Sequence, residues 1–425
     1  MRDILIMAAV FGTLPFAFFR PWIGILLWVW ISLMNPHRLT WGMAYGFPFA
    51  QIAAVTTMAG WLFASDRGKF LGERETWLII ALGALFTVTT LTAMNPDEAW
   101  PKWERVMKIL VMTVLPLFLL QRRERLRALL FTMAISIGFF SVKGGIFAIM
   151  TGGQYIVFGP PQSFISDNNA LALAELMVLP LMIHLGRTEP RRWLRRGLYV
   201  AAFLTLISVV FSYSRGALLG LGAVLAIYVT VGRKWSYGVL ALILAAVSVT
   251  VIPDKWFDRM GTIGTYEQDN SALGRINAWH FAFNIATMRP FVGGGFRVFD
   301  SELFQRYAPN PYAVYDAHSI YFEVLGEHGF VGLALFLALL WSCFASLSTV
   351  SRWSRSDPSL SWASEYVLML RSCFAAYVIG GAFLGLAYFD LFYYLVVAII
   401  ILKVLVRREW VALARNRASP GAAPA

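Results

Sequence analysis

The sequence predicts an all-α protein that crosses a membrane 12 or 13 times and carries one large helical loop on one side. Of its 425 residues, 58% are hydrophobic and only 14% are charged, whereas about 25% of residues are charged in an average soluble protein. Apolar runs long enough to cross about 30 Å of hydrocarbon recur along most of the chain. A single long polar interval, residues 253–328, holds nine of the 24 acidic residues and three of the five histidines.

Aromatic and basic residues are distributed as in a membrane protein. The 16 Trp, 16 Tyr and 33 Phe residues are spread through the apolar runs, as expected for aromatic belts at helix ends rather than for a nucleic-acid surface. The net charge of +12 is then expected to face anionic lipid. Cys343 and Cys373 lie inside apolar segments, so no disulfide framework or zinc site is predicted. No cleavable signal peptide is expected, since a helix begins directly after Met1.

Eleven apolar runs are long enough to be membrane spans, and two shorter runs precede them. The eleven are 45–64, 77–94, 103–120, 128–150, 169–185, 198–211, 216–231, 236–252, 330–350, 363–387 and 391–406. Runs 4–19 and 22–34 are each marginal for a full crossing, because Arg20-Pro21 separates them. The number of crossings is therefore 12 or 13, and the side on which the N-terminus lies stays open.

Alternating basic loops predict the orientation in the membrane. Loops 66–76, 121–127, 186–197, 233–234 and 352–355, with the tail from residue 403, hold 21 of the 36 Lys and Arg residues. By the positive-inside rule these loops are cytoplasmic, which places loop 253–328 on the periplasmic side of a bacterial inner membrane. The predicted parts are an N-terminal bundle (1–252), the periplasmic loop (253–328), C-terminal membrane helices (329–406) and a basic cytoplasmic tail (407–425).

Several polar residues lie in or beside the predicted spans. Lys143 is near the outer end of its span, where an unpaired ammonium costs about 2.5–3.5 kcal/mol unless it snorkels or finds a partner. After a Pro-rich turn, Asp167 and Asn168 are expected to cap the next helix, and Asn169 is the better candidate for a ligand contact. Arg215 opens a helix between small residues. It can bind a phosphate through its planar fork or cap a tight hairpin, and we favour the phosphate.

The polar interval is expected to contain two helices separated by a glycine run. Residues 271–287 predict an amphipathic helix along the membrane surface or over a cavity. Its apolar residues at roughly helical spacing are Leu273, Ile276, Trp279, Phe283 and Ile285 or Ala286. The run 293–295 is expected to form a turn, and its N–H groups are a weaker candidate for an anion-binding nest. His318 is expected to begin the second helix, in the same outer layer as the arginines.

Taken in order, these motifs resemble the O-antigen ligase and O-antigen polymerase superfamily. They are Ser214-Arg215-Gly216, Arg275 with Trp279, Arg289-Pro290, Gly293 to Phe296, His318-Ser319 and Leu325-Gly326-Glu327-His328-Gly329. The N-terminal half, with Lys143-Gly144-Gly145 and the segment from Phe158 to Asn169, is similar to the O-glycosylation ligase branch. At Ser319 the sequence departs from the superfamily, which usually has Asn there, so no role is carried over to that amide.

The resemblance implies a GT-C-like, inverting glycosyltransferase that needs neither a metal nor a cofactor. It would move a glycan en bloc from undecaprenyl diphosphate to lipid A-core, and would not bind nucleic acid. O-antigen polymerase and protein O-oligosaccharyltransferase are the alternatives within the superfamily. A lipid-linked oligosaccharide transporter is the alternative from another class, but no internal repeat is evident and the ionisable residues collect at one face.

The residue types are compatible with this chemistry. A diphosphate leaving group needs positive charge, and a neutral imidazole can take a proton from an attacking hydroxyl. His318 and Arg215 are therefore the predicted catalytic residues. The predicted diphosphate- and glycan-binding residues are Arg275, Arg289, Arg297, Lys143, Asn169 and Tyr321, and Glu327 and Gly294 are predicted to support them. The sequence leaves open which sugar is moved, the acceptor and the oligomeric state.

Overall fold

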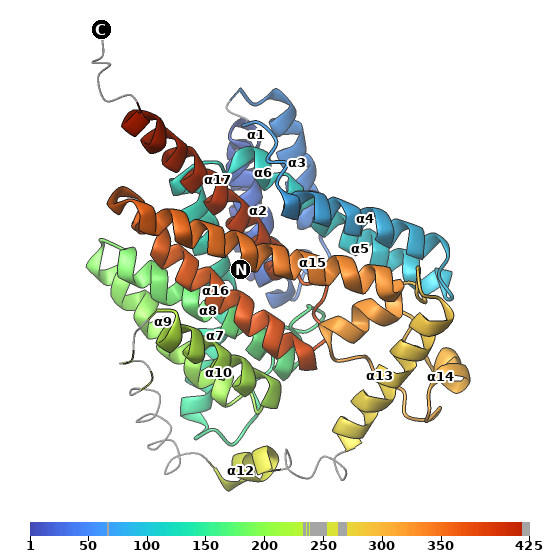
Figure 1. Cartoon of the computed structure of the whole chain (residues 1–425). Coiled ribbons are helices and arrows are strands. Elements are labelled where there is room, and N and C mark those ends of the chain that lie inside the picture. Colours follow the sequence, from blue (N-terminus) through green and yellow to red (C-terminus); the bar gives the residue numbers. More distant parts are fainter. Residues whose placement is uncertain (66–67, 233–234, 236–237, 239–252, 262–269, 419–425) are drawn as a thin grey trace.

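The computed structural model describes the chain except residues 66–67, 233–234, 236–237, 239–252, 262–269 and 419–425 (Figure 1). Throughout the described residues the regular structure is helical, without strands. Seven described helices are long and apolar enough to cross a membrane, and three shorter apolar helices accompany them. The protein is therefore an all-helical, multi-pass membrane protein, while the predicted span 236–252 lies outside the described residues.

Both N-terminal runs form helices. They are α1 (Arg2–Phe19) and α2 (Pro21–Met34), and the break falls at Arg20 because Pro21 begins α2. Val10 of α1 and Leu27 of α2 share a small core with Phe49, the first residue of α3 (Phe49–Phe63). These three helices pack together at one side of the bundle (Figure 1).

The next helices begin or end where proline and polar residues interrupt the apolar runs. They are α4 (Arg74–Leu91), α5 (Pro96–Val114), α6 (Pro116–Leu119), α7 (Arg123–Met150), α8 (Asn168–Thr188), α9 (Arg192–Val210) and α10 (Arg215–Thr230). The predicted span 103–120 is thus two helices, because Pro116 cannot donate a helical hydrogen bond. For α3, α4, α7, α8, α9 and α10 the predicted and observed boundaries agree within six residues. The last helix, α17 (Asp390–Ala418), instead continues well past residue 406, where its span was predicted to end.

Two helices form the centre of the bundle. Most of α8 is buried, and so is every residue of α17 (Asp390–Ala418) from Asp390 to Leu402. A helix that is apolar all round is expected to be surrounded by other helices. Helix α17 runs toward the C-terminus (Figure 1) and packs against α16 (Trp362–Gly380).

The polar interval contains α12 (Asp254–Gly261), α13 (Asn270–Met288) and α14 (Ser301–Tyr307). These helices lie at the end of the molecule opposite the C-terminus (Figure 1). The helix predicted at 271–287 is confirmed, and Ile285 and Ala286 of its predicted apolar face are buried, but Leu273 and Phe283 are exposed. The small residue Ala278 and the ring of Phe281 are buried instead, because α13 packs between α14 and α15 (Ile320–Ser356).

The predicted boundary between loop and membrane at residue 328 is a break within α15. This helix runs from the polar interval into a membrane span, and only Gly329 (φ 65°) departs from helical geometry. His318 does not begin the helix as predicted. It precedes the N-cap residue Ser319, and its φ of 42° lies in the left-handed region.

Candidate active site

The backbone around His318 is held from both sides. The indole N–H of Trp279 donates to the carbonyl of Ala317 at 2.7 Å, and Ser319 is the N-cap residue of α15. Trp279 also stacks on Phe322, with ring centroids 4.9 Å apart. A left-handed conformation is unfavourable for a non-glycine residue and persists only where its surroundings impose it. These contacts hold His318 in the left-handed conformation and place its half-buried imidazole at the start of α15.

Burial and Arg275 together lower the pKa of His318. Burial is the larger cause, and the guanidinium of Arg275 adds to it, while the carboxylates of Asp316, Asp167 and Glu323 act in the opposite direction. A lowered pKa keeps the imidazole neutral near pH 7, so it can accept a proton. Arg275 precedes Trp279 by one helical turn, which puts both side chains on the face of α13 that meets His318.

Arg215 is the first residue of α10, directly after a tight turn. Ser214 caps the helix by accepting the N–H of Ala217 at 3.2 Å. Tyr213, at φ 57°, donates its hydroxyl to the carbonyl of Gly153 at 2.8 Å. Buried neighbours therefore build the turn, and the half-buried Arg215 follows it directly.

The N-terminus of α8 links this turn to His318. Asn168 donates its amide to the carbonyl of Ser212 at 2.7 Å. The preceding residue, Asp167, is one of the carboxylates whose charge acts on His318. Asp167 also caps α8, as predicted, by accepting the N–H groups of Asn169 and Ala170 at 2.9 and 3.1 Å. Three segments far apart in the sequence thus meet at one site.

A buried network of charged groups lies one to two turns along α15. The ammonium of Lys102 is 3.1 Å from Glu323 and 2.8 Å from Glu327. Glu327 also accepts the hydroxyl of Tyr388 at 2.7 Å and the backbone N–H of Arg297 at 2.8 Å. We call these residues the Lys102 network. These contacts join α5 and the segment just before α17 to α15, the helix that follows His318.

Sequence reasoning gave a role only to Glu327 and missed Lys102 and Glu323. One signal was present, because Glu323 and Glu327 are four residues apart and so share a helix face. Two carboxylates on one buried face require a cation. Lys102 is one of only two basic residues in the short loops on the predicted periplasmic side, 35–46, 95–102, 151–168 and 388–390, which makes it a candidate partner.

The glycine run packs against the break in α15. Gly294 and Gly295 donate their N–H groups to the carbonyls of Gly326 and Glu327, both at 2.8 Å. These two donors are therefore not available to an anion, which rules them out of the predicted nest and confirms the turn. A Cβ on Gly293 would lie 2.5 Å from the backbone nitrogen of Gly329, so only glycine allows this approach.

Two of the predicted arginines lie at the glycine run. The guanidinium of Arg289 donates to the carbonyl of Thr92 at 2.5 Å. Arg297 contacts Glu327 through its backbone N–H, and its side chain is exposed. Their predicted contact with the diphosphate stays a prediction.

The other predicted binding residues are distributed between the site and the lipid-facing surface. Tyr321 donates its hydroxyl to the carbonyl of Val378 at 2.9 Å, which joins α15 to α16. Asn169 is half-buried beside Asn168, its amide 3.3 Å from the Asn168 side-chain oxygen. Lys143 is exposed on α7, at an apolar groove of about 550 Å³ that it shares with residues of α8 and α9. Lys143 is thus not among the groups acting on His318.

Within the described residues, no three His, Cys, Asp or Glu side chains are placed to hold a metal ion.

Two family models match the chain. Residues 200–337 match the family described as O-Antigen ligase, and residues 1–189 match a family of unknown function. The first match contains Arg215, Arg275, His318 and Glu327. No curated protein matches the chain.

Proposed function

We propose that this chain, whose residues 200–337 match the family described as O-Antigen ligase, is an inverting glycosyltransferase of that superfamily with a GT-C-like architecture. It transfers a glycan en bloc from undecaprenyl diphosphate to a hydroxyl of lipid A-core. The reaction takes place at the periplasmic face of the bacterial inner membrane, because the basic loops predict that side for His318. The observation that carries the proposal is the half-buried imidazole of His318 on a backbone that Trp279 holds, with its pKa lowered by burial and by Arg275, near the α8 N-terminus that contacts the turn before Arg215.

His318 acts as the general base in this reaction. It takes the proton of the acceptor hydroxyl as the hydroxyl oxygen attacks the anomeric carbon of the glycan. The bond between that carbon and the diphosphate oxygen breaks, and the configuration at the carbon inverts. The proton stays on His318 until it is released to water.

Arg215 and Arg275 stabilise the leaving diphosphate. Negative charge grows on the oxygen that departs from the sugar, and guanidinium groups offer paired N–H donors that match phosphate oxygens. Arg275 serves two purposes, since its charge also helps to keep His318 neutral. Cationic side chains thus supply the stabilisation that a divalent metal would otherwise supply.

The N-terminal half favours a ligase over a polymerase, through its similarity to the O-glycosylation ligase branch. All these enzymes share the donor and differ in the acceptor. A reconstituted assay with undecaprenyl-diphosphate glycan, and with lipid A-core, free glycan or an acceptor protein in parallel, therefore distinguishes them. Transfer to lipid A-core alone is the expected result, and transfer to glycan alone identifies a polymerase.

The His318→Ala variant tests the base in the same assay. Transfer should be lost while the donor still binds in lipid nanodiscs, because no phosphate contact is assigned to His318. The control is His280→Ala, since His280 is exposed on α13 in the same polar interval, and it should transfer normally. Near wild-type transfer by His318→Ala, or loss of donor binding, contradicts the assignment.

A further inference from the structure

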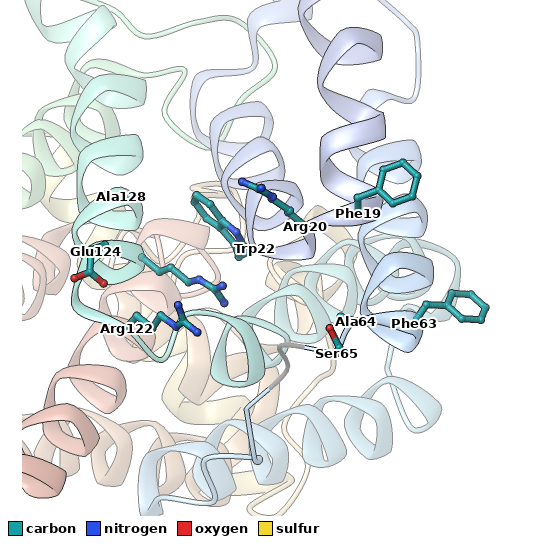
Figure 2. A pocket seen from close by; sticks show the side chains of 10 residues that line it. Phe19, Arg20, Trp22, Phe63, Ala64, Ser65, Arg122, Glu124 and Ala128 are labelled. Carbon is teal, nitrogen blue, oxygen red and sulfur yellow. The ribbon is translucent and has the colours of Figure 1, made fainter.

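A second site lies among the basic loops, at the opposite end of the bundle from His318. A pocket of about 670 Å³ opens where α1 meets α2, where α3 ends and where α7 begins. Figure 2 shows Arg20, Trp22 and Arg122 around it, while Phe19 and Phe63 point away. Its lining residues are Phe19, Arg20, Trp22, Phe63, Ala64, Ser65, Arg122, Glu124, Arg125 and Ala128.

Positive charge dominates this pocket. Three arginines line it, against the single carboxylate of Glu124. Arg125 is held in place, since it donates to the carbonyl of Leu119 at 2.7 Å and lies 5.4 Å from the ring centroid of Trp22. Within the part of the chain that the structure describes, the guanidinium groups of Arg20 and Arg122 make no ion pair or hydrogen bond.

The start of α7 adds to this charge. Its N-cap residue is Arg122, and no side chain caps the first turn. The exposed N–H groups of a helix N-terminus favour an anion, particularly beside arginines. The pocket therefore combines two uncommitted guanidinium groups, an anchored one and the positive end of a 28-residue helix.

The outer rim of the pocket is apolar. Phe19 ends α1 and Phe63 ends α3, and these side chains are 80% and 79% exposed. Aromatic side chains at helix ends typically lie at the boundary between headgroups and hydrocarbon. A ligand with an anionic headgroup and apolar chains would contact both the arginines of the pocket and the aromatic rings at its rim. A soluble anion would contact only the arginines.

We propose that this pocket binds the headgroup of an anionic phospholipid. The phosphodiester lies between Arg20 and Arg122, and the acyl chains run past Phe19 and Phe63 into the bilayer. Basic pockets between membrane helices are a recurring way to bind such headgroups. The bound lipid would then join α2 to the start of α7 at the basic end of the bundle.

Native mass spectrometry of the delipidated protein with added phosphatidylglycerol tests the proposal. Arg20→Gln/Arg122→Gln should bind this lipid about 30-fold more weakly than wild type, which is ~2 kcal/mol at tenfold per 1.4 kcal/mol and matches two guanidinium groups near an anionic lipid. Arg20→Lys/Arg122→Lys keeps both positive charges, on which the attraction to an anionic lipid depends, and should stay within about threefold of wild type. Binding of phosphatidylcholine should be weak and the same for all variants.

The control pair is Arg195→Gln/Arg196→Gln. Both side chains are exposed on α9, in another basic loop, so this variant has the same net charge as the pocket variant. It should bind phosphatidylglycerol like wild type. Equal weakening by the two pairs, unchanged binding after the pocket substitutions, or displacement of the lipid by millimolar inorganic phosphate would each overturn the proposal.

Discussion

Substituting Lys102 by Met should destabilise the protein strongly, because it leaves two carboxylates buried without their cation. Glu327 is 1% exposed and Glu323 is 15% exposed, and both carboxylates lie within 3.1 Å of the Lys102 ammonium. Removing one partner of a buried ion pair costs about 3–5 kcal/mol. Glu327 keeps its bonds from Tyr388 and Arg297, so we expect the lower end, about 3 kcal/mol. That loss changes the folding ratio more than 100-fold, at tenfold per 1.4 kcal/mol.

The change is measured by titration with SDS in mixed micelles, followed by tryptophan fluorescence. Lys108→Met is the matched control, since it makes the same substitution on the same helix. Lys108 pairs with Glu104, and both side chains are exposed at the surface of the bundle, so its removal leaves no carboxylate buried inside the protein. Adding Glu327→Gln to Lys102→Met should restore part of the stability by removing a buried charge. The reasoning is refuted if Lys102→Met unfolds at the same SDS concentration as Lys108→Met.

The remaining predictions concern the site and the glycine run. Arg215→Lys should express normally but lose most transfer activity, because an ammonium lacks the planar fork that binds phosphate; near wild-type transfer would contradict its role. Since the pKa of His318 lies below its usual value of about 6.5, kcat/KM should stay constant down to that pH and fall as the pH drops further. Asp316→Asn removes a charge that raises this pKa, so the inflection should move to lower pH, and a shift upward would exclude His318. Gly293→Ala should destabilise the protein by more than ~1 kcal/mol in SDS titration, and by more than Gly152→Ala, which has a similar φ but open space around its Cβ. Transfer should survive EDTA, and loss that magnesium restores would show a metal requirement.

The helices were largely predictable from the sequence. Apolar runs, with a break at Pro21, locate most of the spans within a few residues. The helix N-termini at Asp167 and Ser214 follow from capping residues that lie next to them in the chain. Several features were misjudged. The span 103–120 is two helices because Pro116 interrupts it, and His318 precedes the N-cap of α15 instead of beginning the helix. The buried face of α13 depends on its two neighbouring helices, and α15 continues past the predicted loop boundary because Gly329 permits a break without ending the helix.

The sequence by itself therefore determined an all-helical membrane protein and named His318 and Arg215 as chemically suited residues. Only the tertiary structure placed Asp167 near His318, paired Lys102 with Glu327, and directed the glycine N–H groups to the carbonyls of α15. The reason is the range of the interactions. A helical hydrogen bond closes within four residues, so neighbouring residues decide it. Lys102 and Glu327 are 225 residues apart, and the packing of the whole bundle decides whether they meet.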